Sequence, residues 1–86
     1  MSELFDLKNE VVLITGGAGL LGVEHSIAVA QHGGLPVLVD VSTSKLELAR
    51  GRLDQLGLLF ESRVYDLGRR ENIENLLQDL LDSGIR

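Results

Sequence analysis

A cluster of glycines near the amino terminus has the spacing of a phosphate-binding turn. The segment from Thr15 to Gly22 reads Thr-Gly-Gly-Ala-Gly-Leu-Leu-Gly and, starting at Gly17, contains the pattern G-x-G-x-x-G. Glycines at this spacing permit a tight strand-to-helix turn, a close approach of the backbone to a pyrophosphate, and tight packing of the helix on the strand. The N–H groups of Leu20 and Leu21 would face the pyrophosphate at the positive end of the helix dipole. We therefore predict a dinucleotide-binding turn, rather than an ordinary glycine turn, formed by Gly16, Gly17, Gly19, Leu20, Leu21 and Gly22.

Two acidic residues follow apolar runs at the places where a nucleotide would need them. Asp40 comes directly after the run 36–39 and lies 24 residues beyond Gly16, close to the separation of about 20 expected for an acid that binds ribose hydroxyls. Its charge would repel a 2′-phosphate, so the sequence favours NAD over NADP; a solvated acid at a strand end is the alternative. Asp66 follows the third expected strand, about 61–65, where it is placed either to reach adenine or to cap the loop before the last helix.

The sequence contains no pattern typical of a metal site, a P-loop, a serine nucleophile or a catalytic carboxylate pair. His25 and His32 are seven residues apart, with no cysteine and no H-E-x-x-H pattern, so we expect no metal site. No Gly-Lys-Ser/Thr follows the glycines and no G-x-S-x-G is present, which excludes a P-loop and a serine nucleophile elbow. Asp79 and Asp82 fall on the polar side of the last expected helix, where a solvated face explains them. We therefore assign no catalytic residue.

The apolar pattern predicts three strands alternating with three helices. Continuous or alternating apolar residues mark strands at 11–15, 36–41 and about 61–65, and each is followed by a pattern with the helical period. Ser42 and Ser44 are alternative N-caps of the second helix. This order predicts an α/β fold of three layers with a parallel sheet in the order 3-2-1, the first half of a Rossmann fold. The residues with helical spacing are Leu20, Val23, Ile27, Ala30, Leu46, Ala49, Leu53, Leu56, Ile73, Leu76, Leu77, Leu80 and Leu81.

Composition limits the classes to which the chain can belong. Its 86 residues are 44% apolar with a net charge of −5, which indicates one small, partial domain over 1–86 and not a nucleic-acid-binding protein. There is no cysteine and the sequence begins with acidic residues. No apolar run approaches the ~20 residues needed to cross a membrane. We expect a soluble cytoplasmic protein that can self-associate through the open edge of its first strand.

The sequence resembles the short-chain dehydrogenase/reductase family over almost its whole length. The resemblance rests on Phe5–Lys8 leading into Val11–Gly17, on the glycine cluster, on Val39-Asp40 and on Tyr65–Leu67. It implies that the chain is the amino-terminal NAD(P)-binding half of such an enzyme. It also implies that the glycine turn binds the pyrophosphate, that Asp40 selects NAD through the adenosine ribose, and that Asp66, with Leu67 beside it, contacts adenine.

The chain departs from the family pattern in two ways. Its glycines read T-G-x-x-G-x-x-G, as in the extended members that are often nucleotide-sugar epimerases or dehydratases, whereas the lead-in resembles the classical members, so both types stay open. The family's Tyr-x-x-x-Lys pair is missing: the single tyrosine, Tyr65, is followed four residues later by Arg69. We therefore expect Tyr65 to be a packing residue and the chain to bind a dinucleotide without transferring hydride. The alternative is a non-catalytic nucleotide-binding or interaction module.

Overall fold

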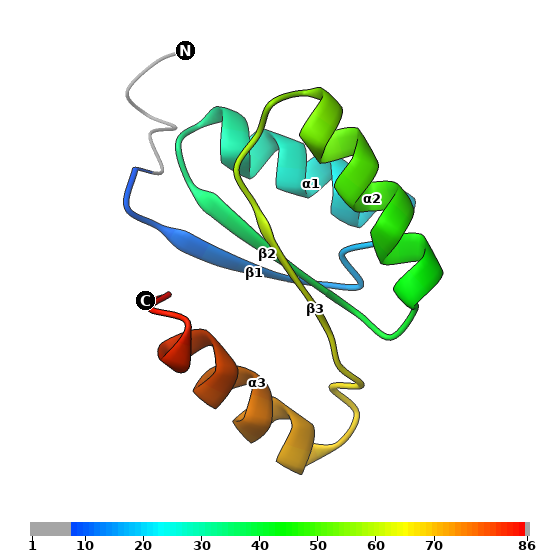
Figure 1. The fold of residues 1–86 in the computed structure, drawn as a ribbon, viewed down its shortest axis with the longest axis vertical. Helices are drawn as coiled ribbons and strands as arrows, with labels where there is room; N and C mark the ends of the chain where they lie inside the picture. Colours follow the sequence, from blue (N-terminus) through cyan, green and yellow to red (C-terminus); the bar gives the residue numbers. More distant parts are fainter. Residues whose placement is uncertain (1–7, 86) are drawn as a thin grey trace.

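Three strands alternate with three helices along the chain. The computed structural model describes residues 8–85 (Figure 1). The lead-in residues 5–7 lie outside the described part. The elements are β1 (Val11–Thr15), α1 (Leu20–Gln31), β2 (Leu35–Asp40), α2 (Thr43–Gln55), β3 (Glu61–Val64) and α3 (Arg70–Asp82). The sheet is parallel with the order β1-β2-β3, which confirms the predicted α/β fold and strand order.

The boundaries differ slightly from those expected. Strand β2 ends at Asp40, and Val41 lies beyond it, exposed. Strand β3 ends at Val64, although the N–H of Tyr65 still donates to the carbonyl of Asp40 at 3.1 Å. Between the two alternative N-caps of α2, the structure selects Ser42, whose Oγ accepts from the N–H of Lys45 at 3.2 Å. The ends of β2 and β3 therefore stay together up to the start of the loops.

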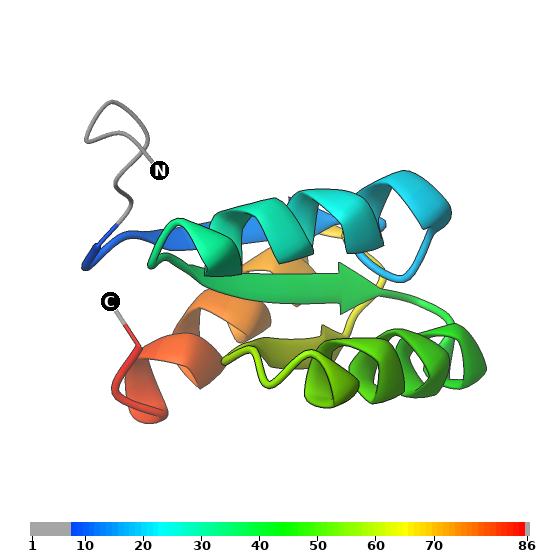
Figure 2. The same ribbon diagram turned by 90° about the horizontal axis from the view of Figure 1, so that it is seen from above.

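Strand β2 is the centre of the molecule. Figure 2 shows it between β1 and β3, and Figure 1 shows α1 and α2 on one side of the sheet with α3 on the other. On the first side, Leu38 packs with residues of α1 and α2; on the other, Val37 and Val39 pack against α3. Because successive strand residues point to opposite faces, β2 contributes fully buried residues to both cores. The buried partners are Val23, Ile27, Leu46, Ala49 and Leu53 on the first side and Leu76 and Leu80 on the second.

Several positions with helical spacing do not reach either core. Leu20 is 82% exposed at the start of α1, and Leu56 is exposed at the end of α2. In α3 the row Ile73, Leu77 and Leu81 is also exposed. The period identified the helices correctly, but a three-stranded sheet is too narrow to cover every apolar position that the helices carry.

Two glycines allow α1 to begin directly against the sheet. A Cβ at Gly17 would lie 2.7 Å from the Cβ of Leu38, and one at Gly22 would lie 2.5 Å from the carbonyl oxygen of Gly16. The N–H of Gly17 also donates to the carbonyl of Val39 at 3.1 Å. The turn therefore contacts β2 so closely that position 17 has no room for a side chain.

We predict that Gly17→Ala lowers the free energy of unfolding by about 2 kcal/mol, because overpacking of a tight core costs about 1–3 kcal/mol and the buried Leu38 backbone has no room to move. The measurement is urea unfolding followed by circular dichroism. Gly51→Ala in α2 is the matched control: apart from the backbone of its own helix, nothing lies within 4 Å of the added Cβ, so it should stabilise the protein by up to about 1 kcal/mol. Equal effects of the two substitutions would contradict this account of the turn.

Candidate functional site

A small cavity lies at the carboxyl ends of the strands, where ligands of open α/β sheets bind. Its volume is about 150 Å³. Three of the predicted site residues, Gly16, Asp40 and Leu67, line it together. The other four lining residues were not predicted from the sequence, although all four stand at or next to strand ends; they are Thr15, Val39, Val41 and Tyr65.

The glycines of the turn have different structural roles from those expected if the G-x-G-x-x-G pattern is counted from Gly17. The left-handed backbone is at Gly16, with φ +64°, one residue earlier. The N–H of Gly19 donates to the carbonyl of Gly16 at 3.1 Å, which closes the turn. Gly17 and Gly22 serve helix-on-sheet packing, and a Cβ at Gly19 would lie 3.4 Å from the Gly16 carbonyl. Gly16 therefore makes the turn, and Gly19 closes it through its N–H group.

The N-terminus of α1 has the features of an anion site. Its N-cap, Gly19, provides no side-chain cap, and the first turn holds no acidic residue. The N–H groups of Leu20 and Leu21 are in the first turn, where a helix offers no internal acceptor. By contrast, the Ser42 side chain caps α2. An anionic group placed beside the turn would meet these N–H groups and the positive end of the helix dipole.

The carboxylate of Asp40 is held by two backbone N–H groups. Its Oδ2 accepts from Ala18 at 3.2 Å and its Oδ1 accepts from Ser42 at 3.0 Å. Asp40 is half-buried and lines the cavity. The contact with Ala18 joins the end of β2 to the glycine turn, which neither the ribose interpretation nor the solvated-acid interpretation included.

Asp66 and Leu67 have different environments. The Asp66 carboxylate is exposed, and its Oδ1 accepts from the N–H of Gly68 at 3.0 Å, which caps the loop before α3. The N-cap of α3 itself is Arg69, without a side-chain cap. Leu67 packs against the α3 side of the core and lines the cavity, whereas Asp66 is not among the lining residues. The loop-cap alternative for Asp66 is therefore present in the structure.

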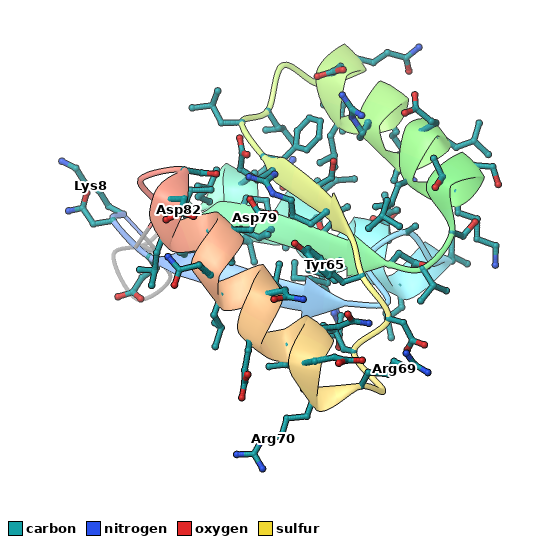
Figure 3. The ribbon with its side chains drawn as sticks, turned by 60° about the horizontal axis from the view of Figure 1, so that its bottom comes forward. Lys8, Tyr65, Arg69, Arg70, Asp79 and Asp82 are labelled. Carbon is teal, nitrogen blue, oxygen red and sulfur yellow. The ribbon has the colours of Figure 1, made fainter. Side chains whose placement is uncertain are left out.

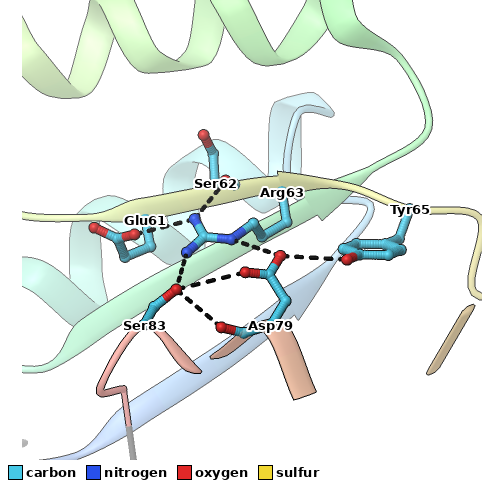
Figure 4. Close-up of polar contacts among 6 residues, drawn as sticks. All are labelled: Glu61, Ser62, Arg63, Tyr65, Asp79 and Ser83. Carbon is cyan, nitrogen blue, oxygen red and sulfur yellow. Dashed lines mark hydrogen bonds and ion pairs between the residues drawn. The ribbon is translucent and has the colours of Figure 1, made fainter. Parts of the chain in front are cut away.

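Tyr65 and Asp79 meet between α3 and the sheet. Figure 3 shows both there, with Arg70 extending away. The Tyr65 hydroxyl donates to Asp79 Oδ2 at 3.2 Å, and the Nε of Arg63 donates to the same oxygen at 3.1 Å (Figure 4). The solvated-face interpretation fits the exposed Asp82 but is wrong for Asp79. Sequence reasoning missed these contacts because the partners of Asp79, Tyr65 just after β3 and Arg63 on β3, lie 14 and 16 residues away in the chain.

Arg63 is the centre of this polar cluster. Its Nη1 lies 3.0 Å from Glu61 Oε1, and its Nη2 donates to Ser83 Oγ at 3.3 Å (Figure 4). Partial burial raises the pKa of Tyr65, as do the charge of Asp79 and its hydrogen bond, while the charge of Arg63 opposes the increase. A tyrosine that serves as a base near neutral pH needs the opposite shift. The cluster therefore fastens α3 to β3, in agreement with the packing role expected for Tyr65.

The described residues show no alternative site of the kinds considered above. Residues 8–85 contain no group of three or more His, Cys, Asp or Glu side chains placed to hold a metal ion. His25 is exposed and His32 half-buried on or beside α1. None of the helices in the same range has the length and apolar character to span a membrane.

The chain is similar to known dehydrogenases over most of its length. It is 30% identical over 79 residues to the short chain dehydrogenase/reductase dpfgG of Gibberella zeae, which covers 92% of this chain. The chain spans only 29% of the length of that relative. No protein-family model matches the sequence.

Solved structures give the same result. A short chain dehydrogenase from Mycobacterium smegmatis superposes with a TM-score of 0.81 at 30% identity, covering 93% of this chain and 35% of its own. An NAD⁺-bound xylitol dehydrogenase superposes with a TM-score of 0.77 at 26% identity, covering 91% of this chain and 30% of its own. In both comparisons the chain corresponds to about a third of a longer protein.

We predict that Tyr65, the single tyrosine in a chain without tryptophan, titrates above its usual pKa of about 10. The pKa of Tyr65 in the folded state exceeds that in the unfolded chain. The protonated tyrosine therefore contributes its full share to the free energy of unfolding below about pH 10, and this contribution is lost as the pH rises through the folded-state pKa. The measurement is the near-ultraviolet absorbance of the phenolate as a function of pH.

Asp79→Asn should move the Tyr65 pKa back toward its ordinary value, because it removes the charge that opposes ionisation. Asp82→Asn on the same helix is the matched control and should leave the titration unchanged, since Asp82 accepts from Gln78 and not from Tyr65. An ordinary Tyr65 titration in the native chain would show that the contact with Asp79 is not formed in solution.

Proposed function

Because the chain belongs to the short-chain dehydrogenase/reductase family, we propose that it is the nicotinamide-dinucleotide-binding segment of an NAD-dependent oxidoreductase of that family. One observation supports the proposal most directly: Gly16 of the glycine turn and Asp40 line one cavity at the carboxyl ends of the strands, and Asp40 also bonds to Ala18, two residues before the uncapped N-terminus of α1. We take residues 1–86 as one partial domain with a cytoplasmic location.

Each part of the site has a role in this proposal. The N–H groups of Leu20 and Leu21, directly after the N-cap Gly19, hold the pyrophosphate. The Asp40 carboxylate accepts hydrogen bonds from the adenosine ribose, and the loop at Asp66 and Leu67 borders the adenine. NAD supplies the hydride-accepting nicotinamide when bound. The protein residues named here bind and orient the adenosine diphosphate part.

Asp40 also accounts for the proposed choice of NAD. A 2′-phosphate on the ribose would lie close to its carboxylate, and like charges at short range repel. No basic residue stands among those that line the cavity, so nothing there would compensate the phosphate charge. We therefore propose NAD as the preferred cofactor.

The proposed function is binding without turnover by the 86 residues themselves. The catalytic Tyr-x-x-x-Lys pair of the family is not in this sequence, and Tyr65 is committed to Asp79. The glycine spacing also leaves open a parent enzyme of the extended type, a nucleotide-sugar epimerase or dehydratase. In either case the adenosine diphosphate site would be the same.

We predict that calorimetric titration with NAD, NADP and AMP gives NAD at least about tenfold tighter binding than NADP, which corresponds to about 1.4 kcal/mol. Asp40→Ala should remove most of this preference, because the repulsion of the 2′-phosphate is lost. Asp54→Ala, which removes an exposed acid on α2, is the control and should leave the preference unchanged.

Two outcomes would contradict parts of this proposal. Equal binding of NAD and NADP by the native chain would show that Asp40 does not select the cofactor. Reproducible NAD-dependent turnover by the purified chain would show that catalysis does not require the missing pair.

The second candidate function is self-association as an interaction module. Strand β1 ends the sheet order, so its outer edge has no strand partner among residues 8–85. Leu13, at its centre, is 44% exposed. It points to the α3 side of the sheet, because Val11, two residues earlier, packs into that core and strand residues two apart share a face. An open edge with an exposed apolar residue is suited to strand pairing.

Helix α3 adds apolar surface on the same side. Asp79 faces β3, and the buried Leu76 and Leu80 face the sheet. At 3.6 residues per turn, the exposed row 73, 77 and 81 lies on the opposite flank of α3 from Asp79, toward β1. We propose that a second copy pairs antiparallel along β1, centred on Leu13, and brings the two α3 rows together.

We predict a dimer by size-exclusion chromatography with light scattering. Leu13→Lys should shift the protein to the monomer, because a charge on an edge strand opposes pairing. Leu48→Lys, which changes an exposed leucine on α2, is the matched control and should leave the dimer intact. A native chain that stays monomeric at high concentration would contradict this second candidate function.

A further inference from the structure

We propose that the Asp40 carboxylate positions the phosphate-binding turn, in addition to recognising the ribose. The inference rests on the proposed function for the identity of the ligand. It concerns a different atom pair from the ribose contact: Oδ2 of Asp40 and the N–H of Ala18, 3.2 Å apart and separated by 22 residues in sequence.

The turn needs such a support because of its composition. Gly16 has φ +64° and no atom within 4 Å of the position of a Cβ, and glycine is the residue with the most backbone freedom. The N–H of Gly19 bonds only within the turn, to the Gly16 carbonyl. Two hydrogen bonds tie the turn to β2, from Gly17 to the Val39 carbonyl and from Ala18 to Asp40. The second has an ionised acceptor, which makes it the stronger type.

The same carboxylate also reaches the start of α2. Its Oδ1 accepts from the N–H of Ser42, the N-cap of that helix. One acid therefore connects the turn before α1 with the cap of α2. A carboxylate offers about four lone-pair positions, so two remain for ribose hydroxyls. Ribose binding and support of the turn are thus compatible, and both depend on one residue.

This arrangement has a consequence for ligands that lack ribose hydroxyls. If Asp40 acted on the ribose alone, its removal would not weaken the binding of a ligand without those hydroxyls, because the only loss would be a negative charge that repels the diphosphate. If it also holds the turn, its removal weakens every ligand whose diphosphate sits at the N-terminus of α1. The two roles can therefore be separated by the choice of ligand.

The test compares ADP with 2′,3′-dideoxy-ADP by calorimetry on the native chain, Asp40→Ala and the control Asp54→Ala. We expect Asp40→Ala to weaken dideoxy-ADP by at least about fivefold and ADP by more, while Asp54→Ala changes neither. Unchanged affinity for dideoxy-ADP in Asp40→Ala would overturn the positioning role and leave the ribose role in place.

A second measurement does not depend on any ligand. Amide hydrogen exchange of Ala18, followed by NMR in the ligand-free chain, should speed up at least about tenfold in Asp40→Ala. Asp40→Asn keeps one acceptor oxygen and should retain part of the protection; it also replaces Asp40→Ala if that variant does not fold. Unchanged Ala18 exchange in a folded variant overturns the inference. Failure of the native chain to bind ADP or NAD, with exchange as expected, would instead contradict the proposed function alone.

Discussion

The close contact between the glycine turn and β2 is the constraint on which the rest of the structure depends. Gly17 lies over Leu38 and Gly22 lies over Gly16, each at a separation that excludes a Cβ. Because of this contact, α1 begins at the carboxyl edge of the sheet rather than beyond it. Its uncapped N-terminus then directly follows the turn that Asp40 contacts through Ala18. The same glycine turn therefore packs α1 against the sheet and forms part of the candidate site.

Strand β2, which the turn contacts, also packs against the helices on both faces of the sheet. Leu38 supports α1 and α2 on one face, and Val37 and Val39 support α3 on the other. The helix α3 is held more loosely, by two buried leucines and by the Arg63–Asp79 pair. A partly exposed ion pair contributes little by itself, about 0–1 kcal/mol. Its value here is orientation, since it determines which flank of α3 faces β3.

That orientation leaves the opposite flank and the edge of β1 uncovered. The relatives with the same fold are longer, and this chain covers 29–35% of those described above. The exposed row on α3 and Leu13 thus belong to a surface that a small sheet cannot bury. The residues proposed to bind the adenosine, by contrast, all lie within the described part of the chain, at the ends of β2 and β3.

The sequence alone determined the order of elements, the parallel sheet and the position of the turn. Glycine spacing, strand runs and the helical period are local signals, and Asp40 follows a strand at a recognisable distance. Only the tertiary structure decided that Asp40 holds Ala18, that Asp79 binds Arg63 and Tyr65, and that Leu20 stays exposed. These outcomes depend on which residues from distant segments meet. Periodicity predicts the face of a helix, but the width and pairing of the sheet decide what that face contacts.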